Sequence, residues 1–195
     1  LLLIDNAQST IPVDSINNDD IQGGQVATEH FIEHGHHSIV ALLGPGTWIT
    51  SARRGQGYRQ AMAGAGLTPH VLHAANTTVE TGKALMHEAL TAVPDLTAIF
   101  AANDAMALGA MRTLAQQKRR VPQDVAVIGF DDTYLGALSE IPLTTMRVFK
   151  SELGKLAAKR MLDMLADPNS PTVQTLLATE LVLRRSCGCE FLVEE

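Results

Sequence analysis

Cysteine, positive charge and long apolar runs are all scarce in this sequence, and each scarcity excludes a class of protein. Only two cysteines occur among the 195 residues, at Cys187 and Cys189 near the end of the chain. A disulfide framework needs several spaced pairs, so we expect free thiols and a reducing compartment. A C-x-C pair can supply half of a metal site, but the sequence has no second cysteine pair to complete it. We therefore predict neither a metal nor a cofactor.

Lysine and arginine are outnumbered by aspartate and glutamate, 15 to 21, so the formal net charge is -6. Duplex binding depends on basic side chains that neutralise phosphates, and the only basic run, 118–120, is typical of an exposed helix end. This argues against a nucleic-acid surface on these residues. The opening run LLLI reaches Asp5 with no basic segment before it. It is too short for a membrane span or a signal peptide, so we expect a cytoplasmic protein.

What the sequence does contain is a regular alternation of helical and strand patterns from about residue 19 onward. Short apolar runs such as SIVALL and VAVIGF lack polar alternation, which indicates strands buried on both faces of a parallel sheet. This order predicts an α/β fold with a doubly wound parallel sheet. The expected helices lie at 19–34, 51–65, 79–92 and 104–117, and the expected strands at 38–43, 70–73, 97–102 and 125–130.

Both ends of the chain depart from this repeat. LLLID is a strand without a preceding helix, and after Asp132 the order changes to a loop, a helix over 151–166 and a strand-like stretch over 172–185. A lone first parallel strand needs a neighbour reached through a crossover, so these segments resemble parts of a second lobe. They hold too few elements for a core of their own. We therefore expect a second lobe that is incomplete in this sequence.

Polar side chains follow the predicted strands at the edge where ligands bind in open parallel sheets. Acid, amide, guanidinium and hydroxyl groups beside one indole suit a neutral polyhydroxylated ligand. Its hydroxyls pair with the polar groups while its apolar face packs on the ring. The candidate ligand-binding residues are Asp5, Trp48, Thr50, Arg54, Thr77, Asn103 and Asp131.

Each candidate also has an ordinary structural interpretation. Asn103 or Asp104 can cap the helix that follows, and one of the adjacent Asp131 and Asp132 can organise its own turn. Arg54 can form an ion pair on a helix surface, and the single indole can belong to the core. The convergence of four strand ends on one edge, and not any single residue, favours a binding site.

Three segments form a specific set: PDLTAIFAANDAMALGA, VPQDVAVIGFDDT and IPLTTMRV. With the sequence around them, over about residues 14–165, they resemble the effector-binding domain of the lactose-repressor (LacI/GalR) family of bacterial transcription regulators. The resemblance implies a two-lobed fold shared with periplasmic sugar-binding proteins. It also implies that Arg54 and Asp131 grip the ligand, that Asn103 supplies an amide, and that the other candidates vary with the effector.

The resemblance divides the chain between two lobes. It assigns 1–17 and 148–179 to remnants of the N-terminal lobe, 18–131 to the C-terminal lobe, 132–147 to a crossover, and 180–195 to the end strand and tail of the C-terminal lobe. In the family, a helix-turn-helix domain and the first part of the N-terminal lobe precede the segment that matches LLLID. We therefore expect this sequence to be an N-terminally truncated piece of such a protein.

The family acts as a homodimer that binds operator DNA through the helix-turn-helix domain, so the resemblance implies those partners and a sugar-like effector. The residues show no catalytic set and no membrane segment, so we expect neither enzymatic activity nor membrane contact. Ordinary core packing at helical spacing is the alternative interpretation of the apolar residues that match the dimer surface. Those residues are Leu108, Met111, Tyr134 and Leu135.

Two other functions fit parts of the sequence. A periplasmic sugar-binding protein of a transporter has the same cleft but is a monomer with a secretion signal. The second is a zinc metallopeptidase, because HFIEH matches H-x-x-E-H, with His30 and His34 on one helical face and Glu33 as base. That motif is short enough to occur by chance, and the helix end beside Gly35 is a poor place to hold a catalytic zinc.

Overall fold

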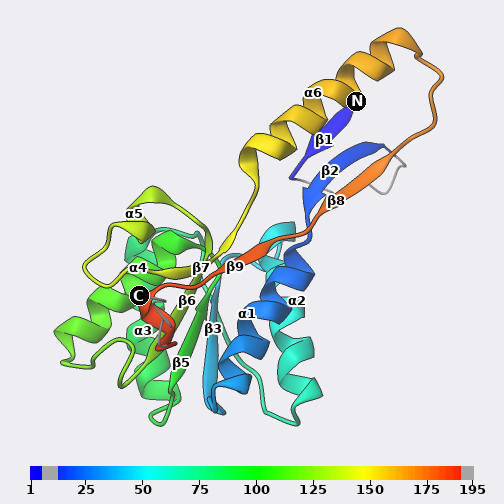
Figure 1. Ribbon diagram of the computed structural model, residues 1–195. Helices are drawn as coiled ribbons and strands as arrows, with labels where there is room; N and C mark the ends of the chain where they lie inside the picture. The colour runs from blue at the N-terminus through cyan, green and yellow to red at the C-terminus, as the bar shows by residue number, and fades with distance from the viewer. Residues whose placement is uncertain (6–12, 190–195) are drawn as a thin grey trace, which may run out of the picture.

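The chain folds around two sheets of unequal size (Figure 1). The structure, a computed structural model, describes residues 1–5 and 13–189. Its larger sheet has the order β4-β3-β5-β6-β7-β9, in which neighbours are parallel except that β9 runs antiparallel to β7. The predicted α/β fold with a doubly wound sheet is confirmed. The strands are β3 (Ile39–Leu43), β4 (His70–His73), β5 (Ala98–Ala101), β6 (Ala126–Asp131), β7 (Thr144–Arg147) and β9 (Glu180–Val182).

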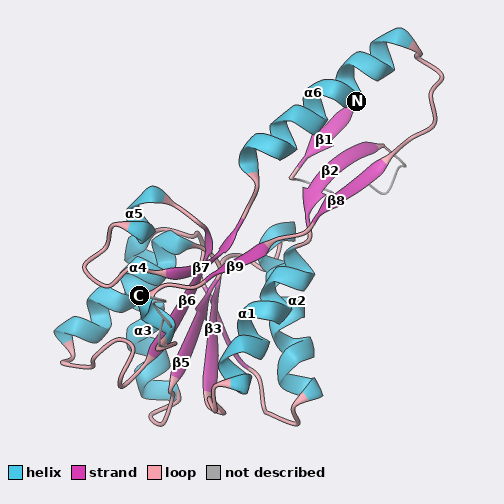
Figure 2. Ribbon diagram, in the orientation of Figure 1, coloured by secondary structure: helices cyan, strands magenta, loops and turns pink. Residues whose placement is uncertain are grey.

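Helices cover both faces of the larger sheet, which explains why its central strands are apolar (Figure 2). Every residue of β3 and β5 is buried. A strand covered on both faces has no solvent side on which polar residues are favoured. One face carries α1 (Asp20–Glu33) and α2 (Ile49–Gly64), and the opposite face carries α3 (Val79–Ala92) and α4 (Asp104–Gln116). We call this sheet and its helices the large lobe.

Two glycines let α1 and α2 approach until their backbones touch. A Cβ atom on Gly24 would lie 2.1 Å from the carbonyl oxygen of Arg54, and one on Gly57 would lie 2.0 Å from that of Ile21. Both distances are far below van der Waals contact, so a side chain at either position would push the helices apart. This packing holds Arg54 of α2 beside the first turn of α1.

The end segments form the smaller sheet, with the order β1-β2-β8 and parallel pairing throughout. One helix, α6, packs on this sheet, and its Arg160 donates from Nε to Asp14 Oδ1 of β2 at 2.6 Å. Among the described residues of this small lobe, Ile16 and Ala157 are the buried apolar side chains. The small lobe therefore has little core of its own. Its elements are β1 (Leu2–Ile4), β2 (Asp14–Asn18), α6 (Lys150–Ala166) and β8 (Gln174–Leu177).

The segment expected as a crossover, 132–147, folds differently from that prediction. It contains the short helix α5 (Tyr134–Ala137) and then β7, which pairs in parallel with β6 and so belongs to the larger sheet. Thr144 and Thr145 are fully buried in β7, and Thr145 Oγ1 donates to Asp104 Oδ1 at 2.6 Å. Buried threonines satisfied by such hydrogen bonds hide a strand from a search for apolar runs.

The stretch expected as one long strand over 172–185 divides between the two sheets. Its first part is β8 of the small lobe, its second part is β9 of the large lobe, and one turn of 3-10 helix, η1 (Arg185–Cys187), follows. The sequence pattern does not reveal β2, because four of the five residues in DSINN are polar although all five are buried. The parts of the expected end segments at 6–12 and 190–195 lie outside the described residues.

Candidate functional site

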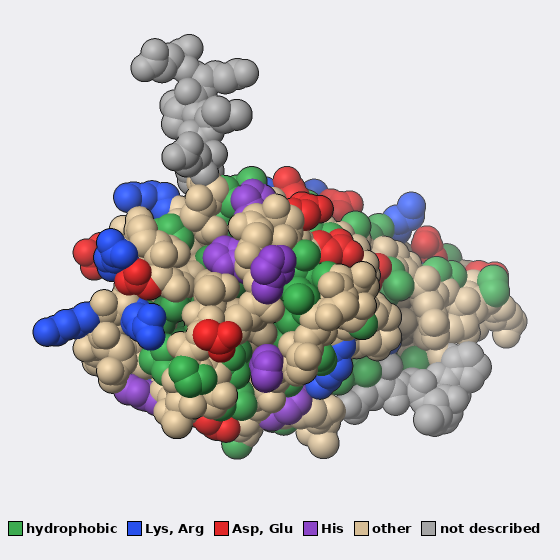
Figure 3. Space-filling view, turned by 90° about the horizontal axis from the view of Figure 1, so that it is seen from below, with side chains coloured by type: hydrophobic (Ala, Val, Ile, Leu, Met, Phe, Trp, Pro, Cys, Tyr) green, Lys and Arg blue, Asp and Glu red, His purple; other side chains and the backbone are tan. Residues whose placement is uncertain are grey.

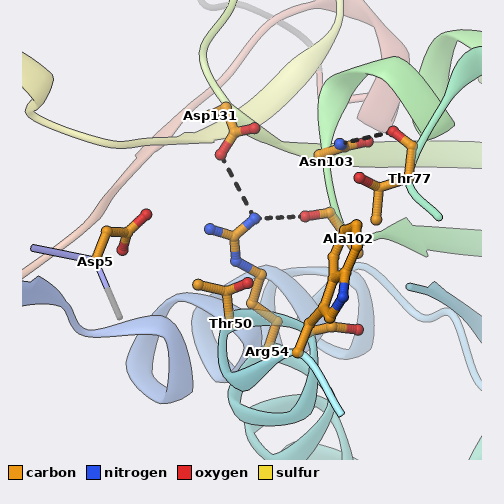
Figure 4. Close-up of a pocket in the computed structure, with 9 residues that line it drawn as sticks. Asp5, Thr50, Arg54, Thr77, Ala102, Asn103 and Asp131 are labelled. Carbon is orange, nitrogen blue, oxygen red and sulfur yellow. Dashed lines mark hydrogen bonds and ion pairs between the residues drawn. The ribbon is translucent and has the colours of Figure 1, made fainter. Parts of the chain in front are cut away.

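A pocket of about 200 Å³ lies at the carboxyl ends of the strands of the larger sheet, where the small lobe faces that sheet (Figure 4). All seven residues singled out from the sequence contribute to its wall, and Ser51 and Ala102 complete it. The wall consists of Asp5, Trp48, Thr50, Ser51, Arg54, Thr77, Ala102, Asn103 and Asp131.

Arg54 occupies the centre of this wall and is only 7% exposed. Its Nε donates to Asp20 Oδ1 at 2.8 Å, and its Nη1 donates to the carbonyl oxygen of Ala102 at 2.6 Å and to Asp131 Oδ1 at 3.4 Å. The guanidinium carbon lies 3.7 Å from the centre of the Phe130 ring, within the range of a cation–π interaction. These contacts hold the guanidinium in one orientation, so it is a fixed group and not a mobile surface side chain.

Asp20 is the residue of this network that sequence reasoning missed. It is 2% exposed, and burial raises the pKa of its carboxyl although the charge and hydrogen bond of Arg54 oppose that shift. An acid in the first turn of a helix is common because it stabilises the helix dipole. The sequence therefore gives no sign that Asp20 is also the ion-pair partner of Arg54. Only the packing of α1 against α2 shows which arginine it contacts.

The two adjacent acids at the end of β6 have different roles. Asp131 lines the pocket from a left-handed backbone position, with φ of 107°. Burial raises the pKa of Asp131 to about 6; the charge of Arg54 opposes this shift and the charge of Asp104 adds to it. Asp132 turns away and forms ion pairs at 2.7 and 2.5 Å with arginines of β7 and of the segment after β9. The first acid is thus available to a ligand, whereas the second joins neighbouring segments of the large lobe.

Asn103 combines the two interpretations that the sequence left open. Its Oδ1 accepts a hydrogen bond from the backbone N–H of Met106 at 2.9 Å, which caps α4. Its Nδ2 donates to the carbonyl oxygen of Thr77 at 3.0 Å, which joins the ends of two neighbouring segments of the wall. The capping role of Asn103 is confirmed, and the same side chain also lines the pocket.

Trp48, Thr50 and Ser51 lie at the start of α2 and form one side of the pocket. Trp48 is 46% exposed, so its ring does not belong to the core. Ser51 is 3% exposed, and its Oγ has no hydrogen-bond partner within the described parts of the chain. An unpaired buried hydroxyl costs about 1–3 kcal/mol, so a ligand group bonded to it would recover part of that cost.

Asp5 faces the same pocket from the small lobe (Figure 4). Its backbone has a left-handed φ of 52°, and its carboxylate accepts a hydrogen bond from Asn18 Nδ2 at 3.0 Å. The pocket therefore presents carboxylates from both lobes around one fixed guanidinium and one exposed indole. Such groups suit ligand hydroxyls and an apolar ring face.

The HFIEH motif, named above as a remote alternative, does not present its two histidines as a zinc pair. His34 Nδ1 lies 2.7 Å from the carbonyl oxygen of His30, and the two rings are 4.3 Å apart. The ring of His30 itself is directed to Cys189, and its Nε2 lies 2.9 Å from the Cys189 Sγ. Among the described residues, the group of side chains placed to hold a metal ion contains neither Glu33 nor His34.

The residues expected at a dimer surface lie together on the side of the large lobe that carries α4 and α5. Leu108, Met111 and Leu135 line one mostly apolar groove of about 380 Å³. Tyr134 and Leu135 are 76% and 72% exposed. Tyr134 and Leu135 therefore do not belong to the core.

Comparisons with known proteins identify the family. A family model described as a periplasmic binding protein-like domain matches residues 28–187. The chain belongs to this family. Among curated relatives, the HTH-type transcriptional regulator CelR of Thermobifida fusca is 36% identical over 176 residues, which are 89% of this chain and 52% of that protein. The chain thus spans about half the length of that relative.

Solved structures of this family superpose closely on the chain. A complex of the transcriptional regulator CelR with cellobiose gives a TM-score of 0.90 at 34% identity, over 95% of this chain and 58% of the other. The lac repressor dimer bound to operator and the anti-inducer ONPF gives 0.87 at 29% identity, over 95% and 56%. These matches confirm the resemblance to the lactose-repressor family, and these relatives are named as regulators rather than enzymes. In the described part of the chain, no helix has the length and apolar character to cross a membrane.

Proposed function

We propose that this chain is the effector-binding and dimerisation part of a bacterial LacI-type transcriptional regulator in the cytoplasm. A small polyhydroxylated ligand, a sugar, binds between the lobes. Its binding controls the affinity of a helix-turn-helix domain, outside residues 1–195, for operator DNA. The chain uses no cofactor and catalyses no reaction in this role.

The observation that carries this proposal is the pocket itself. Eight polar or aromatic side chains from five segments of the chain meet in one hollow, and Arg54 is held there by Asp20 and the carbonyl oxygen of Ala102. Preorganised donors and acceptors favour a ligand with several hydroxyls, because an analogue that lacks one leaves a buried polar atom unpaired. The cellobiose complex of a relative with the same fold supports a sugar as the ligand class.

Three connections between the lobes supply a mechanism for the response. The chain passes from one lobe to the other at 18–20, at 147–150 and at 177–180 (Figure 1). Asp19 N donates to the carbonyl oxygen of Leu177 at 2.8 Å, so two of these connections are bonded to each other. A ligand held by Asp5 on one side and Arg54 on the other favours the lobe orientation in which both reach it. In a dimer, such a reorientation changes the spacing of two DNA-binding heads.

A sugar should stabilise the protein that contains this chain. We expect the melting temperature to rise with cellobiose, ribose or a related sugar, because a ligand at about 100 times its dissociation constant adds about 2.7 kcal/mol of stability. The measurement is a thermal-shift screen of sugars, with adenosine as a ligand of another class. A shift with adenosine and with no sugar would contradict the proposed ligand class.

An acidic substitution in the apolar groove should separate the dimer. Leu135→Asp places a charge on a face that we propose is buried between two copies, so we expect a monomer by light scattering. Arg59→Asp introduces the same side chain at an exposed position of α2, on the opposite face of the sheet from the groove, and should leave the dimer intact. A parent protein that is already a monomer and closes on sugar would instead favour the transporter-type binding protein.

A further inference from the structure

His30, Cys187 and Cys189 form a cluster away from the pocket. One ring nitrogen and two thiol sulfurs lie within 4.8 Å of one another, and the distance from His30 Nε2 to Cys189 Sγ is 2.9 Å. His30 is 9% exposed and Cys187 is 3% exposed, while Cys189 is half-buried. We propose that these three side chains bind one Zn²⁺ ion, which fastens the end of the large lobe to α1.

The backbone directs both cysteines toward the histidine. Gly188, between them, adopts a left-handed conformation with φ of 81° that a residue with a side chain rarely takes. Ser186 fixes the turn from the other side, since its Oγ donates to the carbonyl oxygen of Val127 at 2.6 Å and accepts from the backbone N–H of Thr144 at 2.8 Å. The turn that presents the sulfurs is therefore anchored to β6 and β7 of the larger sheet.

The third donor comes from a remote part of the sequence. His30 lies in the last turn of α1, 159 residues before Cys189. Figure 3 shows several histidine side chains gathered on the lower face of the molecule, but only His30 belongs to the cluster. The sequence analysis considered only a second cysteine pair as the completion of the C-x-C, whereas we propose that a histidine supplies the third donor.

The donor set and its dimensions fit zinc. In a tetrahedral site with Zn–S of about 2.3 Å and Zn–N of about 2.0–2.1 Å, neighbouring donors are about 3.6–3.8 Å apart. The His30–Cys189 contact of 2.9 Å would therefore lengthen by about 0.7 Å when the ion enters. All three donor atoms already lie within 4.8 Å of one another. Two thiolates and an imidazole disfavour Mg²⁺ and Ca²⁺, which prefer oxygen. Three protein ligands leave a fourth position for water.

Zinc binds the thiolate form of cysteine, so its binding would release the protons of Cys187 and Cys189. The ligands differ from the H-x-x-E-H pattern, and the ion would connect two segments of the chain instead of activating a water for peptide hydrolysis.

Zinc retention by the protein that contains this chain tests the proposal. The protein is reduced, incubated with ZnCl₂ and dialysed against metal-free buffer with reductant, and its zinc is measured by mass spectrometry. We expect one ion per chain, and with Co²⁺ in its place a thiolate-to-cobalt charge-transfer band. Cys189→Ser and His30→Gln should each weaken binding by more than about tenfold, since even outer-sphere partners contribute that much.

Matched controls keep the test independent of folding and of the effector. His87→Gln makes the same change as His30→Gln at an exposed position of α3, and this variant should retain zinc. Circular dichroism shows whether the Cys189→Ser variant, changed at a half-buried position, is folded. Three results would overturn the proposal: no retained zinc in the reduced parent, full retention in both ligand variants, or a Cys187–Cys189 disulfide that persists in reductant. The effector-induced thermal shift is measured separately, so its failure concerns only the proposed regulator function.

Discussion

Replacing Arg54 by alanine is expected to unfold or severely weaken the large lobe as well as to abolish ligand binding. The guanidinium is the counter-ion of Asp20, which is 2% exposed. Removal of one partner of a buried ion pair leaves the other charge uncompensated and typically costs about 3–5 kcal/mol. The measurement is the free energy of unfolding by urea, together with the thermal shift produced by sugar.

The loss of unfolding free energy in Arg54→Ala should depend on pH, because its cause is the uncompensated charge of Asp20. Burial raises the pKa of Asp20, and the charge of Arg54 opposes this shift in the parent protein. Without the guanidinium the folded-state pKa rises further above the ordinary value of 3.8. A raised carboxyl pKa means that stability is present at low pH and is lost as pH rises through the folded pKa. The Arg54→Ala defect should therefore be smaller at pH 5.5 than at pH 8.

Two further variants separate the ion pair from the loss of packing. Arg59→Ala removes an exposed arginine from the same helix and should change the unfolding free energy by less than about 0.5 kcal/mol. The double variant Arg54→Ala, Asp20→Asn removes both charges and should recover part of the stability, although binding stays lost. A single Arg54→Ala variant as stable as Arg59→Ala would refute the central role of this network.

The apolar strands of the large lobe could be predicted because burial on both faces leaves a plain signal. The runs IVALL and AVIGF are buried strands where the pattern placed them. By contrast β2 and β7 stay hidden, since Asp14 is buried against Arg160 and Thr145 against Asp104. Hydrophobic patterns register burial only when the buried side chain is apolar. A polar residue with a buried partner looks the same in sequence as a polar residue in water.

The pocket followed from a geometric rule that needs no knowledge of side-chain contacts. Parallel strands end at one edge, so residues just after them meet there, and all seven candidates line one hollow. Asp20 and Ser51 were missed for different reasons. Asp20 lies two residues after β2, a strand that the apolar pattern does not reveal. Asp20 occupies a position where an acid is common for helical reasons alone, and Ser51 is an ordinary residue of a helix's first turn. Ser51 lines the wall, whereas Asp20 accepts a hydrogen bond from Arg54 of the wall, a contact that depends on how α1 and α2 pack.

Asp131→Asn is expected to separate ligand binding from folding stability. The substitution preserves shape, and asparagine tolerates the positive φ of this position as aspartate does. It removes the carboxylate that we propose receives ligand hydroxyls. Hydrogen bonds to an ionised group contribute about 1.5–3 kcal/mol, so the affinity for sugar should fall by about tenfold to a hundredfold, as titration calorimetry would measure.

The same variant should be more stable than the parent without ligand at pH 7.5. Burial raises the pKa of Asp131 to about 6, so the stabilising contribution of this group is present below its ordinary pKa of 3.8 and is lost as pH rises through 6. At pH 7.5 the parent therefore holds a carboxylate whose charge opposes folding. A third of the side chain is exposed, which reduces the effect through solvent screening, and we expect a gain of about 1–2 kcal/mol.

The pH dependence distinguishes this explanation from a general improvement in packing. The gain of Asp131→Asn should be largest above pH 6 and shrink as pH falls from 6 toward 4, because the parent carboxyl then takes up a proton and becomes neutral as the amide is. Asp95→Asn, at an exposed acid after α3, should change neither affinity nor stability. A variant that binds sugar as tightly as the parent, or that is less stable at pH 7.5, would show that Asp131 is a structural residue. Its buried charge would then be compensated by a partner other than the ligand.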